Sequence, residues 1–182
     1  KRSQHRFDLL NVNYIYVPWK SENFKAYLEN LTDRNSILIK SYEDQLIVRM
    51  GYSYNYNSAN DQTRTSSNRN SYSIRVNLEE AGNLLYGISK TIHSAPKEDK
   101  GYVIANIPFA QYVKGDFDFA HNWNIDQRNS LVFHIGMGVA YPYGNSQVLP
   151  FEKRYFSGGP NSVRGWSVRS LGPGSYKGTD GN

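Results

Sequence analysis

The chain has 182 residues, about the length of one domain, with 21 basic and 16 acidic residues and a formal net charge of +5. It contains no cysteine, which excludes a disulfide framework, a thiolate metal site and a cysteine nucleophile. The charge is modest and no basic run stands out, so the sequence predicts no nucleic-acid partner. Only 38% of the residues are hydrophobic, which is little for filling a compact core.

Five segments alternate apolar and polar residues with a period of two, which predicts β-strands. In Gln45–Asn57, an apolar row that includes Val48 and Tyr54 opposes a mainly polar row that includes Arg49 and Asn55. The first of the five segments has the weakest alternation. The predicted strands are Arg6–Val17, Gln45–Asn57, Ser71–Glu79, Phe109–Ile125 and Ser130–Tyr141.

The connections between these strands alternate between long and shorter segments. Lys20–Asp44 and Ala81–Ile107 are long, Ser58–Asn70 is polar, and Asp126–Asn129 is a tight turn. One helix is predicted inside the first connection, where Ser21 can cap it. Its apolar residues, at helical spacing, are Phe24, Tyr27, Leu28 and Leu31.

Alternation alone does not separate a soluble antiparallel sheet from a membrane barrel, but the alternating long and shorter connections and two further features favour the barrel. The apolar rows run through segments of 12 or 13 residues, whereas a strand of about 9–11 residues crosses a bilayer. The opposite rows carry charges at mid-strand, and an Arg facing hydrocarbon would cost about 2–4 kcal/mol. The sequence therefore predicts an all-β, antiparallel transmembrane barrel wall whose lumen-facing charges are Arg49, Arg75, Lys114, Asp116 and Asp118.

Five strands cannot close a transmembrane barrel, whose bacterial single-chain forms have at least about eight. Open sheet edges inside hydrocarbon would leave backbone groups unpaired at several kcal/mol each. Residues 1–182 are therefore interpreted as part of one outer-membrane β-barrel domain, a fragment of about five strands.

The residues that could support catalysis have simpler structural explanations. The four histidines are not at metal-ligand spacing, so no metal site is predicted. Asp116 and Asp118 share a face, as the carboxylates of a hydrolase would, but beside Lys114 they fit neighbouring lumen charges better. No Gly-x-Ser-x-Gly elbow and no complete phosphate-binding loop occur. The sequence predicts neither an enzyme nor a cofactor.

The densest motif lies in the Gly- and Pro-rich segment Leu149–Tyr176, with the sequence LPFEKRYFSGGPNSVRGWSVRSLGPGSY. It resembles the region of the BamA/TamA superfamily of outer-membrane assembly and translocation barrels that carries the sixth extracellular loop. The shared elements, in the same order, are LPFE at 149–152, the SGG that contains Gly158 and Gly159, VRGW (Val163, Arg164, Gly165, Trp166) and the Gly172–Pro173 pair.

The resemblance covers essentially the whole chain and implies that the five strands correspond to the family's strands seven to eleven. It implies that Lys20–Asp44 and Ala81–Ile107 are outer loops and that the other two connections are periplasmic turns. Residues 149–177 would form a loop that enters the barrel lumen. There Arg164, with five donors on a planar fork, would anchor the loop against acidic and aromatic residues of later strands, with Trp166 beside it.

The implied function is the non-enzymatic assembly, insertion or translocation of proteins at the outer membrane of a Gram-negative cell. The implied partners are outer-membrane lipid, client outer-membrane proteins, and accessory assembly or periplasmic subunits. Two alternatives stay open: a secretion pore or passive channel of the same superfamily, and a soluble β-sandwich binding module. The β-sandwich leaves the VRGW motif unexplained.

Overall fold

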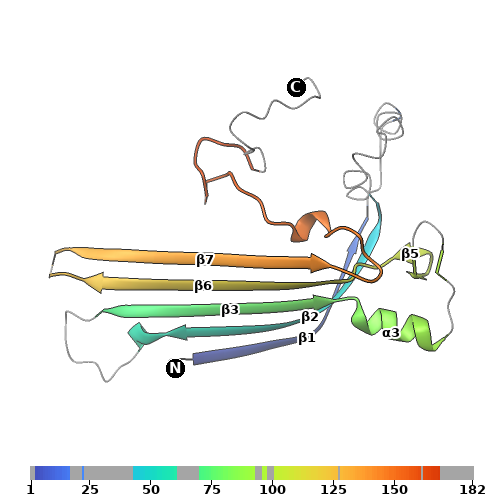
Figure 1. Ribbon diagram of the computed structural model, residues 1–182, viewed down its shortest axis with the longest axis horizontal. Coiled ribbons are helices and arrows are strands. Elements are labelled where there is room, and N and C mark those ends of the chain that lie inside the picture. The colour runs from blue at the N-terminus through green and yellow to red at the C-terminus, as the bar shows by residue number, and fades with distance from the viewer. Residues whose placement is uncertain are drawn as a thin grey trace. The chain divides into compact units, whose positions relative to one another are not determined.

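The computed structural model describes residues 3–16, 22, 43–60, 70–92, 96–97, 101–126, 128–160 and 162–168. It divides into two units, residues 1–151 and 152–182, and the first contains one five-stranded antiparallel sheet. Each strand pairs with the next long strand along the chain, so the sheet is an up-and-down meander with β1 and β7 at its edges (Figure 1). Its strands are β1 (Ser3–Ile15), β2 (Gln45–Asn57), β3 (Ser71–Ala81), β6 (Tyr112–Asn124) and β7 (Ser130–Pro142).

These strands confirm the predicted all-β antiparallel architecture, with small differences at the strand ends. The largest is at the start of β6, which begins at Tyr112 rather than Phe109. Just before β6, the chain does not yet pair with β3. Phe109 instead forms an isolated parallel bridge with Leu46 of β2, and the amide of Ala110 donates to the Leu46 carbonyl over 2.8 Å. Pairing between β6 and β3 therefore begins two residues after Ala110, at Tyr112.

A β-bulge in β1 explains the weak alternation of the first strand. The register shifts between Asp8 and Asn11, so Leu9 and Leu10 together oppose the single residue Met50 of β2. One extra residue in a strand reverses the period-two pattern, so every later side chain would point to the wrong face. The bulge absorbs the extra residue and restores the pattern. With the bulge, Phe7 and Val12 lie on the same face although an even number of residues separates them.

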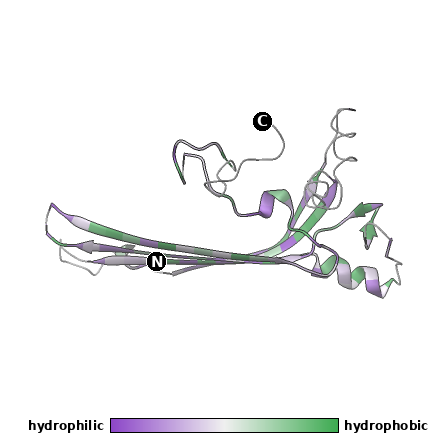
Figure 2. Cartoon of the chain, turned by 45° about the horizontal axis from the view of Figure 1, so that its top comes forward, coloured by the Kyte–Doolittle hydropathy of each residue, from purple (hydrophilic) through white to green (hydrophobic). Residues whose placement is uncertain are grey.

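The buried hydrophobic residues cluster at one end of the sheet, with one cluster on each face. On one face Ile47 packs with Ala81 and Tyr112, and on the other Val48 packs with Leu85 and Phe109. Further along the strands the apolar rows are open: Leu9 is 78% exposed, and Val139 74%. Figure 2 shows β7 largely in the hydrophobic colour, with shorter paler or hydrophilic stretches between.

A soluble β-sandwich would require a second sheet over this apolar face. Among the described residues, the only other sheet is a two-stranded ribbon of β4 (Val103–Ile104) and β5 (Ile107–Pro108). Ile104 of this ribbon and Tyr102, which comes just before it, pack against the buried cluster that contains Val48, at the end of the sheet. The β-sandwich interpretation therefore loses the packing on which it depends.

The helices differ from the prediction. The helix predicted after Ser21 lies outside the described residues, apart from Glu22. Instead, the connection after β3 contains α3 (Asn83–Thr91), and short 3-10 turns occupy η2 (Ser58–Asn60) and η3 (Phe151–Lys153). The prediction gave Ala81–Ile107 as a long connection without a helix, although the apolar spacing within Leu84–Ile92 could have indicated α3 despite Gly82 and Gly87. No helix in the described part of the chain combines the length and apolar character needed to span a membrane.

The side chain of Asn145 fixes the connection between α3 and β6. Its Oδ1 accepts a hydrogen bond from the amide of Tyr102 over 2.7 Å, and its Nδ2 donates to the carbonyls of Tyr102 and Phe109 over 2.9 and 3.0 Å. The amide of Asn145 donates to Oε1 of Gln111 over 2.9 Å. These bonds satisfy loop backbone groups that would otherwise need water.

Candidate functional site on the polar face of the sheet

The register places nearly all strand charges on one face of the sheet, which we call the polar face. Paired residues point the same way, so Arg75 lies beside Asp118, and Glu79 beside Lys114. Among the described strand residues, the opposite or apolar face carries one charged side chain, Glu80. The polar face carries four basic and four acidic ones: Arg6, Arg49, Arg75 and Lys114, and Asp8, Glu79, Asp116 and Asp118.

The most enclosed of these charges form a network at the end of the sheet that holds the buried clusters. Nη1 of Arg49 lies 2.8 Å from Oε2 of Glu79, and the two side chains are 24% and 17% exposed. The buried Tyr112 hydroxyl donates to the other carboxylate oxygen over 2.6 Å. Both oxygens of Glu79 are therefore occupied, so the carboxylate is positioned to hold three strands together rather than to act as a base.

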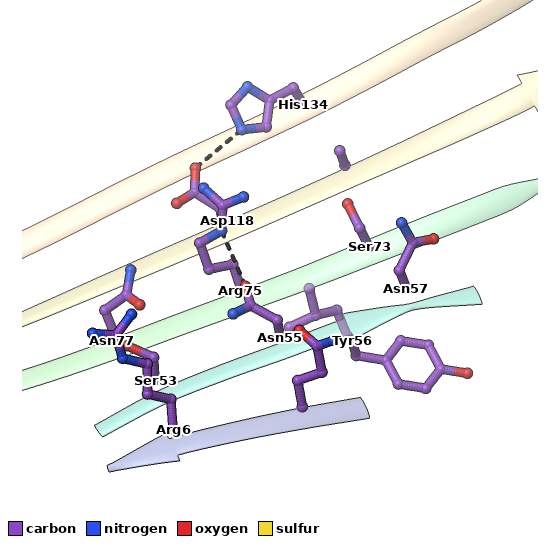
Figure 3. A pocket seen from close by; sticks show the side chains of 13 residues that line it. Arg6, Ser53, Asn55, Tyr56, Asn57, Ser73, Arg75, Asn77, Asp118 and His134 are labelled. Carbon is purple, nitrogen blue, oxygen red and sulfur yellow. Dashed lines mark hydrogen bonds and ion pairs between the residues drawn. The ribbon is translucent and has the colours of Figure 1, made fainter. Parts of the chain in front are cut away.

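Farther along, the polar face forms an open groove of about 840 Å³. Figure 3 shows two polar pairs across it: Nε of Arg75 donates to Oδ1 of Asn55 over 3.1 Å, and His134 Nε2 lies 3.1 Å from Asp118 Oδ1. On β1, Nε of Arg6 pairs with the nearby Asp8 carboxylate over 3.0 Å. The groove is lined by hydrogen-bond donors and acceptors and by side chains of both charges, as expected of a surface in contact with water.

Five charges are predicted to face a lumen. The register places Arg49, Arg75, Lys114, Asp116 and Asp118 together on the polar face, and that this face lines a lumen stays a prediction. The prediction omitted Arg6, Asp8 and Glu79. The bulge obscured the alternation around Arg6 and Asp8, whereas Glu79 already stood in the polar row of its predicted strand and could have been included.

The described residues contain no group of three or more His, Asp or Glu side chains that could hold a metal ion. Asp116 and Asp118 are two residues apart on the same face of β6. Asp118 pairs with His134, whereas Asp116 stands beside Asn77 of β3. The polar face therefore offers a set of cross-strand pairs and no recognisable catalytic arrangement among those residues.

The second unit contains the VRGW segment as a compact reverse turn. The amide of Trp166 donates to the carbonyl of Val163 over 3.4 Å, and the amide of Gly159 donates to the carbonyl of Trp166 over 2.9 Å. Gly165 has φ +91°, which the third residue of a type II turn requires and which other residues rarely adopt. Arg164 therefore occupies the apex of the turn.

The side chain of Arg164 is exposed, and its Nε donates to the carbonyl of Pro160 over 3.4 Å. Among the residues described, it forms no ion pair with an acidic group. Gly159 is held at φ +96°, and a Cβ there would lie 3.0 Å from Val168. The turn thus has a defined backbone that presents the guanidinium outward, with Gly158 also at positive φ.

Comparison with known proteins identifies one family. The family described as the Omp85 superfamily domain matches residues 8–181, nearly the whole chain. No curated protein and no solved structure gives a significant match. With its antiparallel sheet and VRGW turn, the chain belongs to the Omp85 superfamily, the BamA/TamA barrel family of the outer membrane, whose members assemble or translocate proteins and are not enzymes.

Proposed function

We propose that the sheet forms part of the wall of an outer-membrane assembly or translocation barrel, with its apolar face against hydrocarbon and its polar face lining a water-filled lumen. The separation of charges carries this proposal: eight charged side chains lie on one face and one on the other among the described strand residues. An Arg or Lys at the bilayer midplane costs about 2–4 kcal/mol, so only one orientation of the sheet suits a membrane.

The length of the apolar face supports the same orientation. On β7, Tyr141 lies ten residues after Leu131, which is about 34 Å along a strand that rises about 3.4 Å per residue. A tilt of about 40° reduces this to about 26 Å, close to the apolar band of about 25 Å on known outer-membrane barrels. The apolar face therefore fits the thickness of the bilayer.

Aromatic side chains stand at both ends of this apolar face, where a membrane meets water. At one end Tyr56 stacks on Tyr72 with ring centroids 5.4 Å apart, and Trp123 is 52% exposed. At the other end Tyr14 stacks on Tyr16 with centroids 5.8 Å apart. Tyr and Trp favour the two interfaces because one end of each ring system is apolar and the other can form hydrogen bonds.

The edges of the sheet support incorporation into a larger barrel. β1 and β7 each pair with one strand only in the described structure, so their outer edges expose backbone donors and acceptors. In hydrocarbon each unsatisfied group costs several kcal/mol. We place residues 1–182 in one barrel domain in which further strands pair with both edges.

The balance of charge favours assembly or translocation of proteins over an ion-selective channel. The polar face has four basic and four acidic side chains, and the two charged pairs that face each other in register, Arg75–Asp118 and Glu79–Lys114, are of opposite sign. Ion-selective pores instead use rings of one sign. Client outer-membrane proteins are the partners that this function requires.

Within the same proposal, residues 149–177 form the loop that enters the lumen, and Arg164 anchors it. The turn geometry supports this role, because a guanidinium at the apex presents five donors to acidic and aromatic groups of the barrel wall. Val163, Gly165 and Trp166 then serve to build the turn and pack beside the anchor.

The test compares Arg164→Ala and Arg164→Lys with Ser162→Ala, an exposed neighbour, in the full-length protein. We expect both Arg164 variants to reduce assembly of client barrels and to expose the loop to protease, with Ala the more severe, because Lys keeps the charge but loses the fork. Ser162→Ala should behave as the parent. Unchanged assembly and unchanged protease resistance in Arg164→Ala would contradict the anchoring role.

A further inference from the structure

We propose that Leu149 is a positioning residue, which fixes the segment after β7 on the polar face of the sheet and thereby directs the loop that carries Arg164 to that face. This inference rests on the proposed function, in which the polar face lines the lumen and the loop enters it. It assigns a role to the first residue of the LPFE sequence, to which the turn around Arg164 gives none.

A small apolar cluster interrupts the polar face at the end of the sheet that carries the Arg49–Glu79 pair. Ile47 has the same phase as Arg49 along β2, and Ala81 and Tyr112 follow Arg49 in register on β3 and β6. All three of these apolar residues are 0% exposed. On a face that only water contacts, an isoleucine side chain would keep accessible surface, so protein covers this part of the polar face.

Leu149 is part of that cover. It is half-buried and packs on Ile47, Ala81, Ala110 and Tyr112, which we call the polar-face cluster. β7 ends at Pro142, at the same end of the sheet, and Figure 1 shows the chain turning back after this strand. The chain has therefore returned to the polar face before the loop begins.

Hydrogen bonds to Gln111 fix the reversal that brings Leu149 back. The amide of Tyr143 donates to the carbonyl of Gln111 over 3.1 Å, and the amide of Gln111 donates to Oγ of Ser146 over 2.8 Å. The amide of Ser146 donates to the carbonyl of Tyr143 over 3.0 Å, across Gly144 at φ +57°. A Cβ on Gly144 would clash with Oε1 of Gln111, so the turn lies directly against this side chain.

Pro150 continues this fixed direction beyond Leu149. The residue before a proline is confined to extended conformations, and the proline ring holds its own φ at about −65°. Pro150 is buried, and η3 begins at the next residue, Phe151. The chain therefore has little freedom between the contact of Leu149 and the start of the loop.

The loop depends on this contact for its position. Residues 152–182 form a compact unit of their own, so the short segment before them determines where they begin relative to the sheet. Below Leu149, Tyr112 belongs to the polar-face cluster and also donates its hydroxyl to Glu79. The loop thus begins beside the enclosed charges of the polar face, where the proposed function has it enter the lumen.

The experiment measures where the loop lies in the folded full-length protein in vesicles. Nitroxides at Ser162→Cys, on the VRGW turn, and at Asn77→Cys, on the polar face, report their separation by double electron–electron resonance in a background without other cysteines. Leu149→Ala is compared with Leu149→Met, which restores the side-chain volume. Val148→Ala is the matched control, because it shortens the neighbouring side chain, which lies outside the polar-face cluster.

We expect the parent to give one narrow distance distribution. Leu149→Ala should raise the share of molecules outside it about tenfold, because a loss of about 1.4 kcal/mol of apolar packing changes an equilibrium tenfold. Leu149→Met should restore the parent distribution, and Val148→Ala should keep it. Urea titration of the same samples measures the free energy of unfolding of the barrel, which a merely structural role would lower without moving the loop. If Leu149→Ala lowers the folded fraction, Leu149→Val provides the same comparison with a smaller effect.

The outcomes separate this inference from the proposed function. If the parent distribution is narrow and folded Leu149→Ala keeps it, the positioning role is overturned and the lumenal loop stands. Equal broadening in Val148→Ala would also overturn the role, because any change in the segment would then displace the loop. If the parent itself gives a broad distribution, the loop has no fixed place over the polar face. The anchoring role of Arg164 then fails together with that of Leu149.

Discussion

The apolar and polar faces belong to the same five strands and differ only in which alternate residues they present. On β3, Val76 and Asn77 are consecutive, yet Val76 stands beside Phe117 and Asn77 beside Asp116. The apolar face has no covering layer among the described residues beyond the cluster at one end, and the polar face is open as a hydrogen-bonded groove. In water this arrangement would expose a large apolar surface.

The comparison shows that the two faces need two different solvents. A sheet between water and a protein core would bury its apolar face under another layer, as antiparallel sheets usually do. In a sheet between hydrocarbon and a wet lumen, neither face needs a covering protein layer, because lipid contacts the apolar face and water contacts the polar face. Membership of the Omp85 superfamily supplies that environment.

The largest effect should come from a charge placed on the apolar face. We expect Val76→Arg to destabilise the folded barrel by about 2–4 kcal/mol in a bilayer, because the guanidinium would face hydrocarbon. The matched control is Asn77→Arg, where the new charge meets Asp116 on the polar face and should change little. Urea titration in vesicles, followed by heat-modifiable mobility on a gel, measures both. Equal losses in the two variants would remove the distinction between the faces.

A smaller effect should follow from removing consecutive acidic residues on opposite faces. Glu79→Ala leaves the half-buried Arg49 without its partner and Tyr112 without its acceptor, at a cost of about 1–3 kcal/mol. Glu80→Ala removes one acceptor, for the amide of Asn83, and should cost less than about 1 kcal/mol. The same titration compares them, and a greater loss in Glu80→Ala than in Glu79→Ala would rule out the network as the main polar contact at that end.

The smallest effect should lie in the turn between β6 and β7, outside both faces. Hydrogen bonds from the Asn129 side chain and from the amides of Arg128 and Asn129 lower the pKa of Asp126. The pKa of Asp126 is lower in the folded state than in the unfolded state. Its contribution to the free energy of unfolding is therefore present above the ordinary carboxyl pKa of about 4, and it is lost as the pH falls through the folded-state pKa. Between pH 7 and pH 3 the parent should therefore lose slightly more stability than Asp126→Asn. An identical pH dependence would contradict this.

The sequence could predict the strands because their signal is local. A period of two needs only neighbouring residues, so the polar row of β2 and the charges on β6 were predictable from their spacing. The bulge at Leu9 and Leu10 was harder to predict, because an extra residue appears in the sequence only as a loss of periodicity until its pairing partner Met50 is known. The same loss of periodicity kept Arg6 and Asp8 out of the predicted polar row.

Other features depend on contacts distant in sequence. α3 was missed because Gly82 and Gly87 indicate a loop, whereas packing of Leu85 on Phe109 stabilises the helix. The role of Arg164 came from resemblance alone, since a Val-Arg-Gly sequence has no intrinsic partner. The structure adds the turn that places Arg164 at its apex.

The most direct test of the central claim is the accessibility of consecutive spin labels along β6 in the full-length protein in vesicles. Single cysteines at 116, 117, 118 and 119 carry nitroxides, and their collision rates with oxygen, which is concentrated in hydrocarbon, and with a water-soluble nickel chelate are compared. The account predicts strict alternation, with the oxygen preference at Phe117 and Phe119 and the nickel preference at Asp116 and Asp118. Uniform accessibility along the four positions, or a reversed alternation, would contradict it.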